Sequence, residues 1–151
     1  MNLQEELKSL KERISELEEQ VKEEQEFPKD GDEYWFMDMN GDVLSGKWKN
    51  FGIEKDMLEI DNVFGAKEQA EFAAEKLKVE AELRKFSRPF KEDEYNYFIL
   101  INSSHNNIVT DSDDYYQTQG TIYFESTTIA NEAIDTVGEE RIKKYIFGVE
   151  D

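Results

Sequence analysis

The chain has 151 residues and carries 36 Asp and Glu against 18 Lys and Arg, so its formal net charge is −18 at pH 7. This excess of negative charge repels a phosphate backbone and disfavours direct nucleic-acid binding. The absence of Cys excludes a disulfide framework, a thiol nucleophile and a thiolate metal site. No apolar run approaches the roughly 18 residues of a membrane span, and the first residues lack a secretory signal pattern. We therefore expect a soluble cytoplasmic protein with no membrane partner.

A heptad pattern occupies residues 1–27. Its apolar residues alternate at spacings of four and three, the 3.5-residue period of a coiled coil, at Leu3, Leu7, Leu10, Ile14, Leu17 and Val21. In a parallel pair of helices, Glu6 would face Lys11 of the second chain. Arg13 would likewise face Glu18, so both pairs combine opposite charges. We expect a homodimeric coiled coil; the alternative is a helix that folds back on the rest of its own chain.

A hairpin and a helix are predicted in the first half of the remaining chain. The strand-like residues 33–49 are interrupted by Asn40-Gly41, the dipeptide that best fits a type I′ turn. Residues 57–64, MLEIDNVF, are expected to form a loop and a short strand. Residues 66–86 are rich in Ala, Glu, Leu and Lys, which predicts a helix.

The second half repeats this order after a boundary at Pro89. The sequence predicts strands in YNYFILI, IVT and TIYFES, a turn in SSHNN and a loop in DSDDYYQTQG. A helix in TTIANEAIDTV, a break at Gly138 and a last helix in EERIKKYIF follow.

An internal repeat relates the two halves. Val63-Phe64 and Tyr123-Phe124 precede the two Ala-containing helices, and from Phe64 onward the offset is 60 residues. The predicted fold class is therefore α+β, with an N-terminal coiled-coil helix and a tandem ββ(β)α pair with antiparallel sheet. The predicted domains are residues 1–27, 28–90 and 91–151, the last of them acidic.

The charge is concentrated in one segment. Residues 1–27 hold nine acids and four bases, whereas the segment from Glu92 to Glu140 holds eleven acids and no Lys or Arg. A solvated surface normally mixes both signs, so a long segment of one sign costs self-repulsion. The predicted partner-binding residues are the acids of two short runs in this segment, Glu92, Asp93, Glu94, Asp111, Asp113 and Asp114.

Two interpretations of these acids stay open. They serve solubility alone, or they imitate phosphates, because carboxylates accept paired hydrogen bonds from Arg and attract Lys as phosphates do. Aromatic residues of the same segment either anchor such an interface or belong to the core; these are Tyr95, Tyr97, Tyr115, Tyr116 and Tyr123.

Signals for catalysis are weak, and we expect no enzyme and no cofactor. His105, the one histidine, falls in the turn SSHNN, and no nucleophile-elbow motif surrounds Ser103 or Ser104. Residues 38–42 resemble the start of a calcium loop, but Val43 stands where that loop requires Gly. Residues 111–114 offer oxygen ligands for a hard cation, an arrangement common in acidic loops.

Several segments carry a resemblance. DEYWFMDMNGDV, NVFGAKEQAEFAAEKLKVEAELRKF, GTIYFES and VGEERIKKY, over roughly residues 30–148, resemble a group of small phage and prophage proteins of Gram-positive bacteria. This resemblance implies a non-enzymatic accessory protein acting inside a bacterium. A compact, acidic protein that a phage carries into a bacterium is similar to anti-CRISPR proteins, several of which inhibit Cas9-type nucleases as DNA mimics. The expected function is such an inhibitor; the alternative is a non-catalytic coiled-coil adaptor with no nuclease target.

Overall fold

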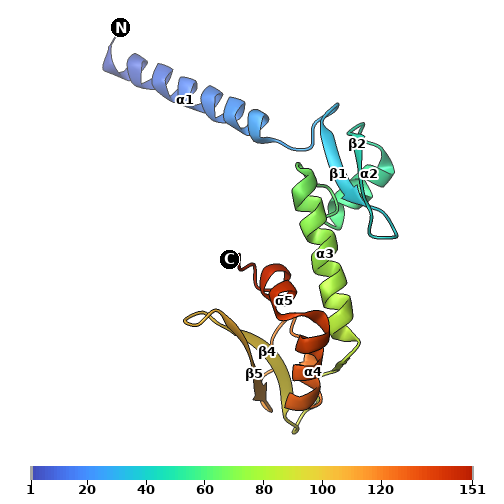
Figure 1. Ribbon diagram of the computed structural model, residues 1–151. Helices are drawn as coiled ribbons and strands as arrows, with labels where there is room; N and C mark the ends of the chain where they lie inside the picture. The colour runs from blue at the N-terminus through green and yellow to red at the C-terminus, as the bar shows by residue number, and fades with distance from the viewer. Residues whose placement is uncertain (1, 151) are drawn as a thin grey trace. The chain divides into compact units, whose positions relative to one another are not determined.

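The computed structural model describes residues 2–150, without the side chain of residue 25, and has the predicted α+β class (Figure 1). The chain divides into two compact units, one up to Ala70 and one from Glu71. The sequence predicts this boundary between residues 90 and 91. The difference arises because Val79 and Leu83, on the helix that precedes Pro89, belong to the core of the second unit.

The N-terminal helix α1 spans Leu3–Gln25, as the heptad pattern predicts. A capping box fixes its start: the N–H of Glu5 donates to Asn2 Oδ1 at 2.9 Å, and the N–H of Asn2 donates to Glu5 Oε2 at 3.2 Å. These two bonds satisfy backbone donors that the first turn would otherwise leave without a partner.

Strands β1 (Glu33–Met37) and β2 (Val43–Lys47) form the predicted antiparallel hairpin. The expected two-residue type I′ turn is wrong, because that turn needs positive φ at both central residues and only Gly41, at +81°, has it. The connection is longer, and Asp38 closes it. Its carboxylate accepts the N–H groups of Asn40 and Asp42, each at 2.9 Å, which is turn chemistry rather than calcium binding.

Helix α2 spans Gly52–Glu59, so the loop predicted at the start of MLEIDNVF is wrong. Buried Glu54 explains the helix. Its carboxylate accepts the N–H groups of Lys49 and Phe51, each at 2.9 Å, and the hydroxyl of Tyr34 at 2.7 Å. Burial would raise the pKa of Glu54, but the bonds from Phe51, Tyr34 and Lys49 outweigh it and lower the pKa below its ordinary value. One side chain thus fixes the start of α2 and ties it to β1.

The core of the first unit is aromatic. Tyr34 lies 5.6 Å from Phe36 and 5.4 Å from Trp48 between ring centroids, the latter edge to face. The Tyr34 ring covers Gly46, its cross-strand partner, where a Cβ atom would meet the ring at 3.4 Å. Val63 completes the buried cluster.

The predicted short strand at the end of MLEIDNVF is a single β-bridge. Phe64 exchanges two hydrogen bonds of 2.9 Å with Trp35, and helix α3 (Lys67–Arg84) begins three residues later. In the second unit, Tyr97 pairs antiparallel with Phe124, and helix α4 (Thr127–Val137) again begins three residues later. The same order of hairpin, third strand and helix therefore occurs twice along the chain.

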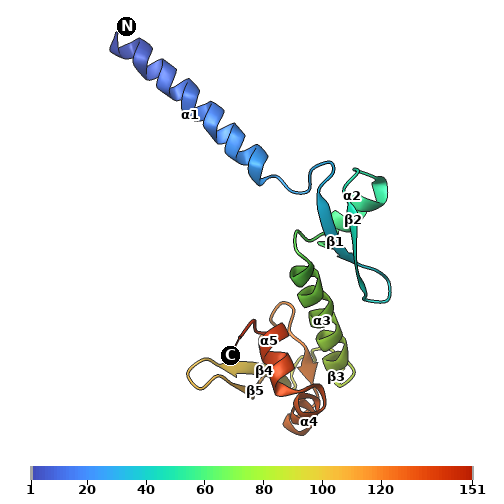
Figure 2. The same ribbon diagram turned by 45° about the horizontal axis from the view of Figure 1, so that its top comes forward.

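The second unit contains a four-stranded antiparallel sheet in the order β3-β6-β4-β5. Its strands are β3 (Ser87–Arg88), β4 (Asn96–Asn102), β5 (Asn107–Asp113) and β6 (Tyr123–Phe124). The strand β3 was not predicted, and residues 111–113 extend β5 instead of starting a loop. Helices α4 and α5 (Glu139–Tyr145) lie beside the β4–β5 hairpin (Figure 2), with the expected break at Gly138, whose φ is +105°.

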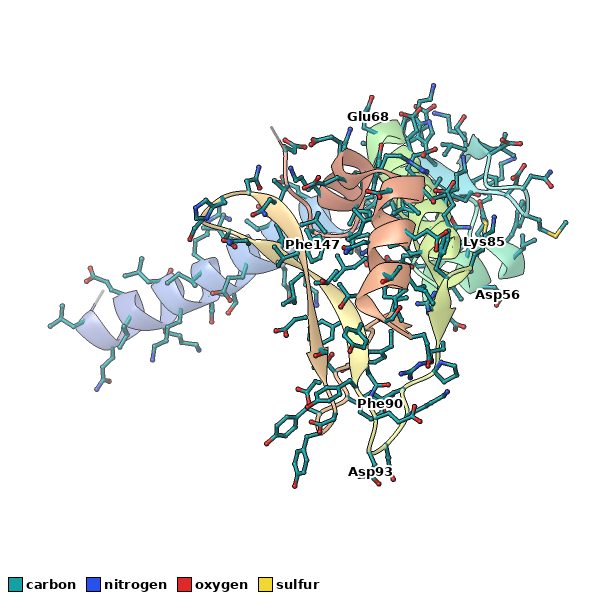
Figure 3. The ribbon with its side chains drawn as sticks, turned by 60° about the horizontal axis from the view of Figure 1, so that its bottom comes forward. Asp56, Glu68, Lys85, Phe90, Asp93 and Phe147 are labelled. Carbon is teal, nitrogen blue, oxygen red and sulfur yellow. The ribbon has the colours of Figure 1, made fainter. Side chains whose placement is uncertain are left out.

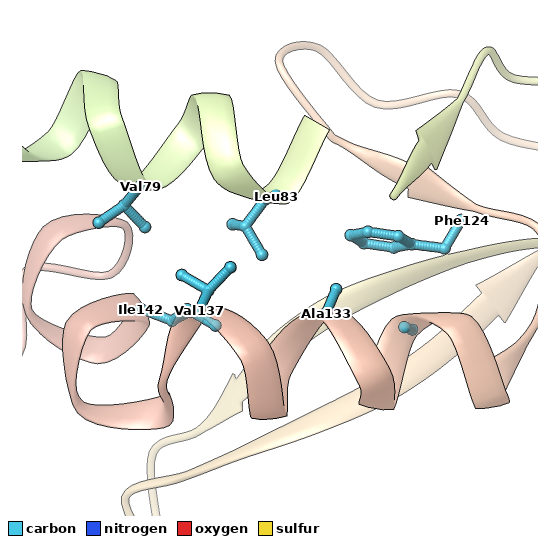
Figure 4. Packing of buried hydrophobic residues seen from close by; sticks show 7 residues of the cluster. Val79, Leu83, Phe124, Ala133, Val137 and Ile142 are labelled. Atoms are coloured by element: carbon cyan, nitrogen blue, oxygen red, sulfur yellow. The ribbon is translucent and has the colours of Figure 1, made fainter. Parts of the chain in front are cut away.

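The core of the second unit fills the space between helices and sheet (Figure 4). Phe124 of β6 points into it beside Leu83 of α3, and Val137 of α4 lies near Ile142 of α5. Phe124 and Ile142 are completely buried. Small Ala residues on α4, among them Ala133, let this helix lie close to the sheet.

Among the described residues, no helix is both long and apolar enough to cross a membrane.

We predict that Glu54→Gln destabilises the first unit at neutral pH and weakens its pH dependence. Because the folded-state pKa of Glu54 is lowered, its carboxylate stabilises the fold above the ordinary pKa of 4.5, and this contribution disappears as pH falls through the lowered value. Both tryptophans of the chain, Trp35 and Trp48, lie in this unit, so tryptophan fluorescence during thermal unfolding measures it selectively.

The matched control is Glu59→Gln, on the exposed end of the same helix. The wild type and the control should lose more thermal stability on acidification than Glu54→Gln. Equal losses in all three proteins would contradict the assigned role of Glu54.

Candidate interaction surface

The two short acidic runs that are predicted to bind a partner meet at one end of the β4–β5 hairpin. Residues 91–95 lead into β4, and residues 113–116 leave β5. Asn96 and Asp113 are cross-strand partners, so the two segments are neighbours. Figure 3 shows Asp93 at this tip of the second unit, with Phe90 nearby.

A buried amide, Asn96, organises this end of the hairpin. Its side chain is completely buried and makes hydrogen bonds with both of its polar atoms. Nδ2 donates to the carbonyl oxygens of Lys91 and Glu94 at 2.9 Å and of Asp113 at 3.3 Å. Oδ1 accepts the N–H of Lys91 at 2.9 Å and Nη1 of Arg88 at 2.6 Å. Asn96 therefore holds the acidic loop against the end of β5.

Arg88 also holds this loop, through hydrogen bonds to its backbone. Its side chain is only 12% exposed, and its guanidinium donates to the carbonyl oxygens of Pro89 and Tyr95, each at 2.9 Å. It also forms an ion pair with Glu125 and lies 4.0 Å from Glu94. These contacts partly neutralise the two carboxylates, so they add less to a negative surface than their number suggests.

Asp113 has a structural role as well. Its Oδ1 accepts the N–H groups of Tyr115 at 2.7 Å and Tyr116 at 2.9 Å, and these two bonds lower the pKa of Asp113. The turn that they form leaves Tyr115 81% exposed and Tyr116 67% exposed, with their rings 5.1 Å apart. The Asp113 carboxylate thus positions two tyrosines.

The other predicted acids of this end are available to a partner. Glu92, Asp93, Asp111 and Asp114 are exposed, and none of the four has an ion pair within residues 2–150. We call the set formed by the exposed acids and tyrosines of the two segments the acidic tyrosine surface; its members are Glu92, Asp93, Tyr95, Asp114, Tyr115 and Tyr116. Asp111 lies beside this set on β5, two residues before Asp113.

The remaining acids of the segment lie elsewhere in the second unit. Glu132 and Asp135 are exposed on α4. Glu139 and Glu140 begin α5, where both pair with Lys143, at 3.7 and 3.3 Å. Glu139 also accepts the N–H of Ile108 at 3.1 Å, near the opposite end of β5 from Asp113. The structure therefore gathers the two predicted acidic runs but not all eleven acids.

The five tyrosines considered as anchors separate into two groups. Tyr95, at 61% exposed, joins Tyr115 and Tyr116 on the surface, whereas Tyr123 is buried and Tyr97 packs against the core. The difference between Tyr95 and Tyr97 follows from where β4 begins: Tyr95 lies in the loop before the strand, whereas Tyr97 lies within it and packs against the core.

His105, the histidine considered for catalysis, is exposed in its turn. The Asp113 carboxylate accepts hydrogen bonds from backbone N–H groups. Residues 2–150 contain no group of three or more His, Asp or Glu arranged to hold a metal ion.

Two residues of this site were missed in the sequence: Asn96 and Arg88. Asn96 stands at the start of a strongly apolar strand, where a polar residue signals a specific buried hydrogen-bond network. Nothing in the sequence pattern marks Arg88. Arg88 and Lys91 lie beyond the end of α3 and face acids of this end of the hairpin, with Lys91 3.9 Å from Glu94 and from Glu125.

No family model matches this chain, and comparisons with the curated proteins and with the solved structures also found no match.

We predict that Asn96→Ala destabilises the second unit by about 3 kcal/mol, because it leaves buried backbone groups without hydrogen-bond partners. Native-state hydrogen exchange of core amides in this unit measures the change. Asn131→Ala, on the exposed face of α4, is the control and should change stability by less than about 0.5 kcal/mol. Similar effects of the two substitutions would contradict the central position given to Asn96.

Proposed function

We propose that this protein is a non-catalytic inhibitor that occupies the DNA-binding groove of a host defence nuclease, with a Cas9-type effector as the target. It would act in the cytoplasm of a bacterium that carries the phage or prophage. The observation that carries this proposal is the acidic tyrosine surface: exposed carboxylates without an ion pair within residues 2–150 and three exposed tyrosines, on two segments that the buried side chain of Asn96 joins.

The chemistry of the surface suits a basic groove. Cas9-type effectors hold nucleic acid in positively charged channels and read a short duplex motif with Arg side chains. Carboxylates accept the same charge-assisted hydrogen bonds from Arg that phosphates accept. Binding at the groove would prevent DNA loading, and no bond needs to be made or broken.

The tyrosines supply binding free energy that the charges alone do not. Exposed charge pairs add little affinity in water, whereas buried aromatic side chains dominate many interfaces. Asp113 holds the backbone N–H groups of Tyr115 and Tyr116, so the entropy cost of ordering the backbone of this turn is partly met before binding. We expect the carboxylates to determine the rate of association and its salt dependence, and the tyrosines to determine how long the complex lasts.

A coiled-coil adaptor is the second candidate function. The observation that favours it is the position of Glu132, Asp135 and Glu140, which lie on α4 and α5 and not on the two segments of the acidic tyrosine surface. Acids spread in this way serve solubility, and the partner of an adaptor need not bind nucleic acid.

Charge-matched double variants distinguish the two functions. Glu92→Gln with Asp114→Asn removes one Glu and one Asp from the acidic tyrosine surface, taken from its two segments. Glu132→Gln with Asp135→Asn removes the same charges from α4. We predict that the first pair weakens inhibition of DNA cleavage by a guide-loaded Cas9-type nuclease about tenfold, corresponding to about 1.4 kcal/mol, and that the second pair leaves inhibition within about twofold.

Inhibition is measured as the protein concentration that halves the cleavage rate, at two salt concentrations. Equal weakening by both pairs would mean that net charge rather than this surface is responsible. Absence of inhibition by the wild type over a panel of Cas9-type nucleases would favour the adaptor.

A further inference from the structure

We propose that α1 pairs with α1 of a second copy of this chain as a parallel, in-register, two-stranded coiled coil. The inference concerns a different part of the chain from the acidic tyrosine surface and does not depend on the proposed function.

Within residues 2–150, no other part of the chain covers the apolar stripe of α1. All six heptad residues are exposed, from 42% at Leu17 to 82% at Leu3. Isolated apolar residues are common on protein surfaces, but six on one helical stripe form a continuous apolar surface, which is typical of an interaction site. The stripe has the 3.5-residue period that a second helix requires, because that period keeps one seam facing the partner along its whole length.

The charges of α1 are arranged around this stripe. Between residues 4 and 20, the flanking g and e positions hold two acids, two bases and two Gln, so their net charge is zero; they are Gln4, Glu6, Lys11, Arg13, Glu18 and Gln20. The outward positions hold five acids and two Lys; the acids are Glu5, Glu12, Glu16, Glu19 and Glu23. The negative charge of α1 therefore lies mainly on the side away from the seam, where it opposes pairing least.

The same charges select one orientation. In a parallel in-register pair, Glu6 faces Lys11 and Arg13 faces Glu18, both with opposite signs, on each side of the seam. In the antiparallel arrangement that overlays the same stripe, Arg13 would lie opposite Arg13 of the second copy, and Lys11 opposite Lys11. Like charges at these positions disfavour that arrangement.

Arg13 is free to change its partner. In the single chain it forms an ion pair with Glu16 at 3.3 Å, one turn away on the same helix. Both side chains are more than half exposed, and such pairs contribute little to stability. Replacing the ion pair with Glu16 by one with Glu18 of the second copy therefore costs little free energy.

The second copy has one consequence for the proposed function: each particle carries two acidic tyrosine surfaces. Two surfaces that reach two sites on a target at the same time would bind more tightly than one.

Single cysteine substitutions in the full chain test this pairing without background, because the wild type contains no Cys. In a parallel in-register pair, Leu17→Cys places two thiols side by side, and mild oxidation should give a covalent dimer. In the antiparallel arrangement the two thiols would be separated by ten residues, or about 15 Å along the helix, too far for a disulfide. Ser15→Cys, at an outward position of α1, is the control.

Sedimentation of the oxidant-free wild type measures the mass independently. We expect twice the chain mass at micromolar concentration, and a single chain mass for Leu10→Glu. Faster cross-linking of Leu17→Cys than of Ser15→Cys supports the parallel pair. A wild type that sediments as a monomer, or equal cross-linking of the two variants, would overturn the proposal and leave the nuclease test above unaffected.

Discussion

The acidic end of the second unit depends on one buried amide. Asn96 satisfies carbonyl groups of Lys91, Glu94 and Asp113 with a single side chain, and in doing so joins the loop before β4 to the end of β5. Without this network, adjacent carboxylates would repel one another and the loop would spread. The buried hydrogen bonds of Asn96 thus hold together a surface whose carboxylates repel one another.

The first unit uses the same device with a charged side chain. Glu54 and Asn96 are the two polar residues found buried in the part of the chain that the structure describes, one in each unit. Each side chain accepts hydrogen bonds from backbone N–H groups of a loop and fixes the start of the next element, α2 or β4. Buried polar groups are costly unless every bond is made, so each unit depends on the geometry around one residue.

The elements with strong periodicity or propensity were predictable, and the polar contacts were not. The sequence located α1, α3 and α4 within one or two residues, because heptad spacing, Ala content and Gly138 are local signals. It missed α2, whose start is fixed by hydrogen bonds to the carboxylate of Glu54, a buried side chain that also binds Tyr34, twenty residues earlier. It identified the acids of the candidate surface but not Asn96 and Arg88, whose roles exist only once β3, β4 and β5 are assembled.

We propose that the acidic tyrosine surface and duplex DNA compete for one groove on the target. A guide-loaded Cas9-type nuclease, immobilised with this protein bound, is exposed to increasing concentrations of duplex that carries the short motif the nuclease reads. We predict that the duplex releases the protein, and that bound protein in turn prevents duplex binding. Simultaneous binding of protein and duplex, each with unchanged affinity, would contradict it.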